Sequence, residues 1–160
     1  MAVDYFLKID GIPGESQDAK HKDEIEVLSW SWGESAVGQP GPGSGAGSGK
    51  VQFQDFHFTS LISKASPKLM EACASGKHMK SAVLTARRAG GGKAEFLTFA
   101  FSDVLITSFE TGGGEDDTVP VDSSALRFSQ IRVEYRVTKP DGTLGTPVKF
   151  GWDIAKNKKL

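Results

Sequence analysis

Alternation of apolar and polar residues along most of the chain predicts β-strands. The first strand is expected at residues 3–9, where apolar side chains recur at every second position before a Gly-Ile-Pro-Gly turn. The same pattern predicts further strands at about residues 24–32, 50–60, 81–88 and 94–101, one that begins at Val104 and is closed by the glycines at 112–114, and two more at 131–137 and 148–154. The segments at 81–88 and 94–101 flank a run of three glycines and are expected to form a hairpin.

The predicted second strand changes its pattern midway. Ile25 and Val27 fall on one face, whereas Leu28, Trp30 and Trp32 fall on the other. A β-bulge near Val27 would produce this switch, and so would burial of both faces.

One short helix interrupts the strands. Ser66 is expected to cap its N-terminus, Pro67 suits the first turn, and Gly76 is expected to end it in the left-handed conformation. At under three turns the helix cannot be stable alone, so it must dock on the sheet. Its docking stripe is expected to comprise Leu69, Met70 and Cys73.

Together these elements predict a mainly β fold, an antiparallel β-barrel of two packed sheets with one short flanking α-helix. The length of 160 residues suits a single domain spanning residues 1–160. Cys73, the one cysteine, cannot form an internal disulfide and is expected to act as a small buried hydrophobe.

Residues 38–49 read Gly-Gln-Pro-Gly-Pro-Gly-Ser-Gly-Ala-Gly-Ser-Gly and predict a flexible loop inside the domain. The following Gly49-Lys50 invites a phosphate-loop interpretation. Ser44 stands where that motif needs its first glycine, and Val51 replaces the hydroxyl that would meet magnesium. The spacing therefore argues against nucleotide binding.

Charge and hydropathy exclude several classes of partner. The net charge of −1 gives no general field for nucleic acid or an anionic membrane. No run approaches the ~20 apolar residues of a membrane-spanning helix, and the N-terminal residues lack the features of a signal peptide. We expect synthesis in the cytoplasm, no membrane insertion, and any export by a route that reads no cleavable signal.

No motif points to catalysis, and we expect no catalytic, cofactor or metal site. His21, His57 and His78 lack the close spacing of a zinc site, and no Gly-x-Ser-x-Gly elbow occurs. The acidic run at 115–117 lacks the alternating ligands of a calcium loop. A hydrolase with a site assembled in space stays open, and histidine-sensitive turnover would support it.

A ligand-binding alternative rests on the tryptophans. Trp30, Trp32 and Trp152 could form a carbohydrate platform on a β-sandwich, although aromatic residues in strands are first of all core residues. Glycan binding by a monomer would favour this interpretation over self-assembly.

Segments along nearly the whole chain resemble the haemolysin-coregulated protein (Hcp) family, the tube subunits of bacterial type VI secretion systems. Each segment is weak alone, but their order and spacing over about 150 residues are specific. The matching segments are residues 5–16 with Asp18 and His21, 29–33, 64–69, 76–78, 82–91, 103–108, 131–135, 151–154 and 157–158.

The resemblance implies a compact β-barrel with a flanking helix, six copies of which close into a ring. Rings would stack into a tube that a contracting sheath expels and that carries effector proteins in its lumen. Sheath, baseplate and spike proteins would be further partners, and the apparatus itself would be the export route. No enzymatic activity or cofactor is implied.

In this family the region corresponding to residues 38–49 projects toward a neighbouring ring. The residues expected to take part in ring stacking are Gln39, Pro40, Gly41, Pro42, Gly43, Ser44 and Gly45. Ordering so flexible a loop costs roughly 1 kcal/mol or more per fixed residue, so we expect rings that form readily and stack weakly in isolation. Leu28 and Phe56 are expected among the apolar positions that a monomer leaves uncovered.

Overall fold

The computed structural model describes residues 2–37, 50–90 and 92–160 and contains ten strands and one helix in these segments. The strands are β1 (Val3–Ile9), β2 (Ile25–Ser31), β3 (Glu34–Val37), β4 (Lys50–Phe53), β5 (Phe56–Leu61), β6 (His78–Arg88), β7 (Glu95–Gly112), β8 (Val121–Tyr135), β9 (Val148–Asp153) and β10 (Lys158–Lys159). The helix is α1 (Ala65–Ser75). The expected mainly β fold is confirmed.

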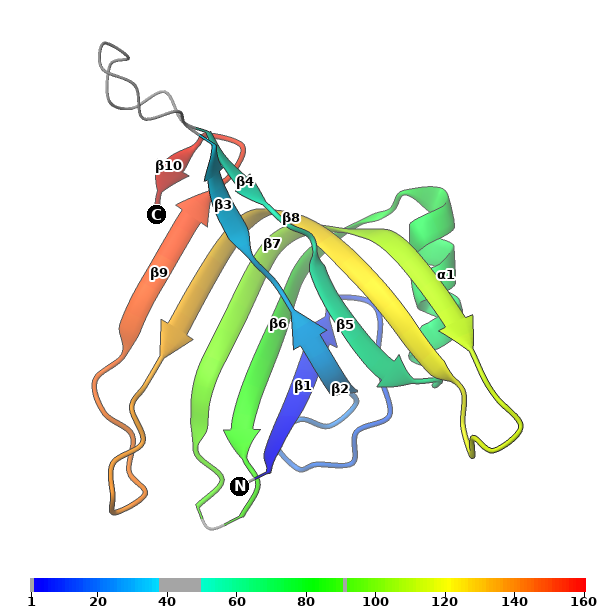
Figure 1. The fold of residues 1–160 in the computed structure, drawn as a ribbon, viewed down its shortest axis with the longest axis horizontal. Helices are drawn as coiled ribbons and strands as arrows, with labels where there is room; N and C mark the ends of the chain where they lie inside the picture. The colour runs from blue at the N-terminus through cyan, green and yellow to red at the C-terminus, as the bar shows by residue number, and fades with distance from the viewer. Residues whose placement is uncertain (1, 38–49, 91) are drawn as a thin grey trace.

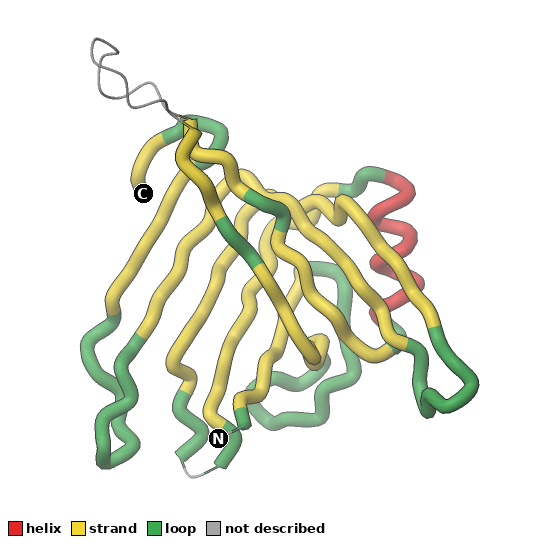
Figure 2. Tube along the Cα trace, in the orientation of Figure 1, coloured by secondary structure: helices red, strands yellow, loops and turns green. Residues whose placement is uncertain are grey.

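Six of the strands form a closed antiparallel barrel (Figure 1). The eight-stranded sheet runs β10-β9-β8-β5-β2-β1-β6-β7, and a second pairing between β8 and β7 closes it. β7 pairs with β8 along one edge, and the other edge is shared by β5, at residues 121–126, and by β9, at residues 130–135. β9 and β10 therefore extend the sheet beyond the barrel, next to the second half of β8. β3 and β4 form a separate two-stranded sheet, and α1 lies at one end of the molecule (Figure 2).

Aromatic rings fill the barrel. Phe56 and Phe101 are fully buried and their ring centroids lie 5.0 Å apart, while Phe101 and Phe128 lie 4.6 Å apart. These side chains come from β5, β7 and β8, which alternate inward apolar positions as strands with one buried face do. Buried aromatic packing of this density favours a single well-defined core.

The bulge expected near Val27 is present, because the register of β2 against β5 shifts between Val27 and Ser29. The predicted hairpin at 81–88 and 94–101 is also present as β6 and β7. Several boundaries differ from the sequence prediction: β8 begins at Val121 and not near residue 131, β6 begins at His78, and β3 and β10 were not predicted. The segment at 50–60 divides into β4 and β5, and the segment at 94–101 joins the one that begins at Val104 as a single strand, which continues through Asp103, whose φ is 55°.

The helix ends as expected but begins differently. Gly76 closes it with a φ of 66°. Ser66 is not the N-cap, because Lys64 occupies that position without a side-chain cap. Instead, the buried Ser66 hydroxyl accepts a hydrogen bond from the Ser63 amide and donates one to the buried Asp122 carboxylate on β8. This contact ties the start of α1 to the barrel.

The expected docking stripe of the helix needs a correction. Leu69 is buried as predicted, but Met70 is 39% exposed and Cys73 is half-buried. The other helix positions that are buried are Ala65, Ser66 and Ala72. Small residues let α1 approach the barrel closely, and a hydropathy pattern that looks for large side chains misses them.

Candidate functional site

The residues predicted for ring stacking, Gln39 to Gly45, lie outside the described residues. The strands that flank them are described and form a hairpin, with Glu34 opposite Phe53 and Val37 opposite Lys50. The two ends of the segment at 38–49 therefore leave from adjacent positions on the β3–β4 hairpin.

The three histidines occupy separate environments. His21 is buried between the carboxylates of Glu24 and Glu95, at 2.9 and 2.7 Å from its two ring nitrogens, and its ring stacks on Phe6. His57 is exposed on β5. His21 is thus a hydrogen-bonded structural residue that attaches the loop after β1 to the start of β7.

His78 belongs to a small surface network. Its Nδ1 lies 3.0 Å from Asp103, whose other oxygen accepts a 2.7 Å hydrogen bond from Ser129. The Ser129 hydroxyl, followed by His78, lowers the pKa of the Asp103 carboxyl. Because the serine and the histidine both contact the aspartate, the serine is not paired with the base as a hydrolase nucleophile would be. Across residues 2–37, 50–90 and 92–160, no three histidine, cysteine or acidic side chains gather as metal ligands.

The tryptophans pack against the core. The ring centroid of Trp30 lies 5.1 Å from that of Phe99 and 5.8 Å from that of Phe56. The ring of Trp32 stacks on that of Phe53, with their centroids 6.2 Å apart. The Trp32 indole also donates a 3.0 Å hydrogen bond to the Gln54 carbonyl. Rings that stack on other protein rings leave little open face for a sugar, so this geometry disfavours the carbohydrate platform.

Exposed apolar side chains gather in two places, and the first is the end of β5. We call this set the β5 patch, and it consists of Leu28, Leu61, Ile62 and Val121, which are 54%, 46%, 38% and 39% exposed. Leu61 pairs with Val121 across β5 and β8, and Leu28, Leu61 and Ile62 line a cavity of about 280 Å³. The expected exposure of Leu28 is confirmed. The expectation for Phe56 is wrong, because its ring is fully buried in the barrel.

The second gathering lies where β9 extends the sheet. We call this set the β9 patch, and it consists of Tyr135, Val137, Val148 and Phe150, which are 42%, 54%, 67% and 38% exposed. Tyr135 pairs with Val148, and two residues further along Val133 pairs with Phe150, on the same face of the sheet. Phe150 also lines an apolar groove with Phe53 and Trp152, between β9 and the β3–β4 hairpin.

Sequence reasoning missed the β9 patch. It predicted strands from the regular alternation at 131–137 and 148–154 but did not say which of their apolar side chains stay exposed. No local signal separates the exposed Tyr135 from the fully buried Ile131 in the same run, because the exposure depends on β9 extending the sheet beyond the barrel.

The two patches are well separated. Val121 begins β8 and Tyr135 ends it, and the arch of this long strand places its ends on opposite sides of the molecule (Figure 1). Fourteen steps along a strand span up to roughly 45 Å. Each patch is therefore available to a different neighbour.

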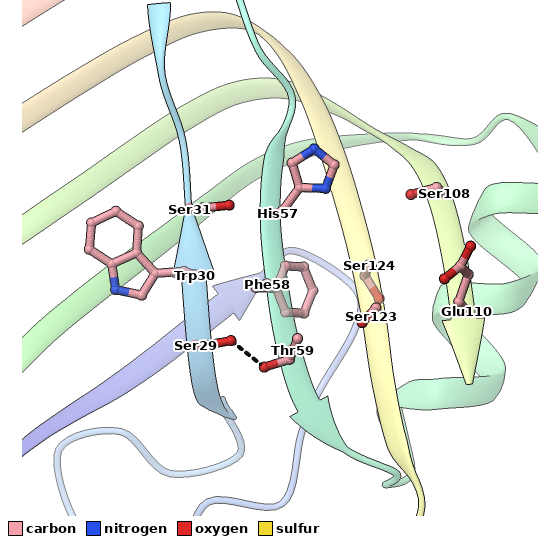
Figure 3. Close-up of a pocket in the computed structure, with 10 residues that line it drawn as sticks. All are labelled: Ser29, Trp30, Ser31, His57, Phe58, Thr59, Ser108, Glu110, Ser123 and Ser124. Carbon is pink, nitrogen blue, oxygen red and sulfur yellow. Dashed lines mark hydrogen bonds between the residues drawn. The ribbon is translucent and has the colours of Figure 1, made fainter. Parts of the chain in front are cut away.

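A third surface is polar and built from small side chains (Figure 3). Ser29, Ser31, His57, Thr59, Ser108, Glu110 and Ser123 line a shallow cavity of about 340 Å³ over β2, β5, β8 and β7. Ser29 and Thr59 are linked by a 2.6 Å hydrogen bond. We call this surface the serine face.

A closed barrel with two distinct apolar patches defines a protein that contacts other protein surfaces rather than one with an enclosed site. The comparisons with known proteins agree. The sequence model of the family described as "Type VI secretion system effector, Hcp" matches residues 6–135. Protein hcp1 of Pseudomonas aeruginosa is 47% identical over 159 residues, which cover 98% of each chain. The chain belongs to the Hcp family of type VI secretion proteins, as the resemblance indicated.

Solved structures show the same relationship. The crystal structure of Hcp1 from Salmonella typhimurium is 38% identical, covers 100% of both chains and superimposes with a TM-score of 0.82. A structure described as a type six secretion system protein is 28% identical, covers 99% of this chain and 100% of its own, and gives a TM-score of 0.92. Hcp proteins are secreted structural components of the type VI system and not an enzyme family. No helix in the described part of the chain is long and apolar enough to cross a bilayer.

Proposed function

We propose that this protein is the structural subunit of a type VI secretion tube, in which six copies close into a ring and rings stack. The observation that carries the proposal is the pair of exposed apolar patches at opposite ends of β8. A ring uses a heterologous contact, in which one surface of each copy meets a different surface of the next. The β5 patch and the β9 patch supply two such surfaces.

The mass of the protein in solution tests the ring. Light scattering after size exclusion, over a range of protein concentrations, is expected to give six times the 17.1 kDa subunit mass. Leu28→Asp and Phe150→Asp each place a charge in one patch and are expected to give monomers, because a buried unpaired charge opposes association. Met70→Asp, at an apolar helix residue that is exposed outside both patches, is the matched control and is expected to keep the ring.

Mixing the two patch variants sharpens this test. Leu28→Asp retains an intact β9 patch, and Phe150→Asp retains an intact β5 patch. One intact pair of surfaces can form in the mixture, so a species of two subunits is expected and nothing larger. A wild-type monomer at every concentration would contradict the ring.

We propose further that the loop containing Gln39 to Gly45 joins one ring to the next. The described β3–β4 hairpin carries both ends of that loop, which is consistent with a projecting connection. Deletion of residues 39–48 is expected to leave the ring mass unchanged and to remove the stacked species seen at high concentration. Stacking that survives the deletion would contradict this role.

The proposal extends to export. We infer that sheath, baseplate and spike proteins handle the tube, that the protein is made in the cytoplasm and leaves through the apparatus, and that effector proteins travel in the lumen. The serine face is our candidate for the lumen surface, because it carries small polar side chains and none of the residues of the two patches.

A double substitution on the serine face tests whether this surface contacts effector proteins without affecting ring assembly. Ser31→Arg with Ser123→Arg adds bulk and charge while leaving both patches intact. The ring mass is expected to stay unchanged, and proteins that co-purify with the wild-type ring from secreting cells are expected to be lost. Unchanged co-purification would show that the cargo binds elsewhere.

A further inference from the structure

A buried carboxylate lies where α1 meets the barrel. Asp122 on β8 is 1% exposed, and its Oδ2 accepts a 2.5 Å hydrogen bond from the Ser66 hydroxyl of α1. The other oxygen, Oδ1, is also buried and has no hydrogen-bond partner among the described residues. Over residues 2–37, 50–90 and 92–160, no lysine, arginine or histidine nitrogen lies within 4.0 Å of this carboxylate. Within the described chain, hydrogen bonding therefore reaches only one of the two oxygens of Asp122.

Three buried serines lie next to Asp122. Ser124 is two residues further along β8 on the same face of the sheet, and its hydroxyl also has no partner in the described chain, although the residue is only 2% exposed. Ser60 lies directly opposite Asp122 on β5, and Ser66 reaches it from α1. The three serines leave more space in the core than leucine or phenylalanine would. We call Asp122, Ser60, Ser66 and Ser124 the Asp122 site.

The chemistry of the site favours a monovalent cation. Burial of an ionised carboxylate is unfavourable unless a cation or further hydrogen bonds compensate its charge. Carboxylate and hydroxyl oxygens are hard ligands, which bind hard cations and not the softer transition metals. Calcium requires about six to eight oxygen ligands and magnesium retains several waters, so neither suits four side chains in a packed core. Asp122 is the one acidic residue among the four, and a single positive charge balances its single negative charge.

We propose that the Asp122 site binds a sodium ion through Oδ1 of Asp122 and the hydroxyl oxygen of Ser124. These are the two buried side-chain atoms of the site that have no partner among the described residues. Sodium is smaller than potassium, and a packed core favours the smaller ion. The site is complete within one chain, so the inference does not depend on the proposed ring.

The ion would strengthen the contact between two elements. Asp122 and Ser124 belong to β8, and Ser66 holds the second oxygen of the same carboxylate from the start of α1. Leu61 and Val121 of the β5 patch form the next pair along β5 and β8, with their side chains on the opposite face of the sheet. Sodium binding is therefore expected to stabilise both the attachment of α1 and the strand ends that carry the β5 patch.

Thermal unfolding in different chloride salts tests the site. The midpoint of the wild type is compared at one protein concentration in about 0.15 M NaCl, KCl or choline chloride, so that ionic screening is the same throughout. A cation that binds the folded chain and not the unfolded one raises the midpoint by mass action. We expect the midpoint in NaCl to be about 2–4 °C higher than in choline chloride, with KCl between the two. The difference is expected to grow with the NaCl concentration.

Two ligand variants and one control locate the effect. Asp122→Asn removes the charge at nearly constant size, and Ser124→Ala removes the second oxygen, so each is expected to have equal midpoints in NaCl and choline chloride. Ser123→Ala changes the exposed serine between them and is expected to keep the full sodium effect. Circular dichroism shows whether each variant is folded. If Asp122→Asn is not, Ser124→Ala carries the test alone, because it leaves the hydrogen bond between Ser66 and Asp122 intact.

Sodium NMR gives a direct readout of the ion. The wild type is expected to broaden the sodium resonance more than an equal concentration of Ser124→Ala does. Equal midpoints in the three salts, a higher midpoint in KCl than in NaCl, or a sodium effect that persists in both ligand variants would each overturn the proposal. The first of these results would leave a water molecule or a proton to compensate the buried carboxylate.

Discussion

At the scale of single residues, the buried Arg87 decides how the loop after β1 is held. Its guanidinium is 4% exposed and donates hydrogen bonds of 2.9 and 2.8 Å to the two oxygens of Asp18, with Asp4 at 3.5 Å. This bidentate bond is the main reason that the pKa of the Asp18 carboxyl lies well below its usual range, against the opposing effect of desolvation. The pair ties the loop to β6.

The Asp18–Arg87 pair predicts a pH dependence. Because the pKa of Asp18 is lower in the folded chain than the usual value of 3.8, the unfolded chain binds more protons at low pH. The stabilisation is therefore complete well above pH 4, decreases as the pH falls below about 4, and is lost only when the pH falls through the lowered pKa of the folded chain. Asp18→Asn is expected to be less stable than the wild type at pH 7, and this difference is expected to be smaller at pH 2 without disappearing, because the folded-state pKa of Asp18 lies lower still. Urea midpoints at the two pH values measure this, and a gap that stays constant would contradict it.

Gly14 is required by a close approach of two backbones. A Cβ at this position would clash with the carbonyl of Glu24, and the Gly14 amide donates a 2.8 Å hydrogen bond to the Asp23 carbonyl. Gly14→Ala is expected to destabilise the fold by about 1–3 kcal/mol, the usual cost of overpacking. Gly112→Ala, where a Cβ meets nothing within 4 Å, is the control and is expected to change little. Equal denaturation midpoints for the two variants would contradict this, because they would show that the loop around Gly14 relaxes to accept a Cβ without loss of stability.

At the scale of elements, α1 shows that hydropathy alone does not decide which helix residues pack against the barrel. Leu69 is 1% exposed and Met70 is 39% exposed, although both are large and apolar and adjacent in sequence. Leu69→Ala is expected to lower the free energy of unfolding by about 2–5 kcal/mol through the cavity it leaves. Met70→Ala is expected to cost less than about 0.5 kcal/mol, as surface substitutions usually do. Chemical denaturation of both variants measures the difference, and similar losses would contradict the docking of α1 seen here.

Strands and bends were predicted correctly where the local alternation of apolar and polar residues determines the structure. The alternation at 3–9 identified β1, and the switch of parity after Val27 had two explanations, of which the structure shows the bulge. Prediction failed where tertiary contacts decide. β3 is a four-residue strand that exists through its pairing with β4, and β7 continues through Asp103 because β6 and β8 pair with it on both sides of that residue. Neither partner can be read from local sequence.

The candidate site was less predictable than the fold. Leu28 and Phe56 both occupy apolar positions in strands that pair with each other, yet one is exposed and the other is fully buried. Whether an apolar side chain in these strands is buried depends on whether it lies on the face of the sheet that the barrel encloses. The alternation around Tyr135 and Phe150 predicted strands but not their exposure, which follows from the extension of β9 beyond the barrel.

At the scale of the whole molecule, closure of the barrel concentrates the exposed apolar surface. A closed barrel has no free strand edges, so association through added strands is limited to the β9–β10 extension and the β3–β4 hairpin. What remains is side-chain contact, and the exposed large apolar groups of the strands gather in the β5 and β9 patches. An assembly that places one patch on the other buries both.

Assembly through these patches predicts that thermal stability depends on protein concentration. A neighbour that binds the folded chain and not the unfolded one stabilises it by mass action. Each tenfold rise in concentration, above the level at which rings form, is expected to raise the unfolding midpoint by roughly 2–5 °C. Leu28→Asp changes an exposed residue, so its monomer is expected to unfold at a temperature that does not depend on concentration. Scanning calorimetry of both proteins over two decades of concentration measures this. If the wild type showed the same flat response, subunit contact would add nothing to the stability of the barrel, and the two patches would need partners other than copies of this chain.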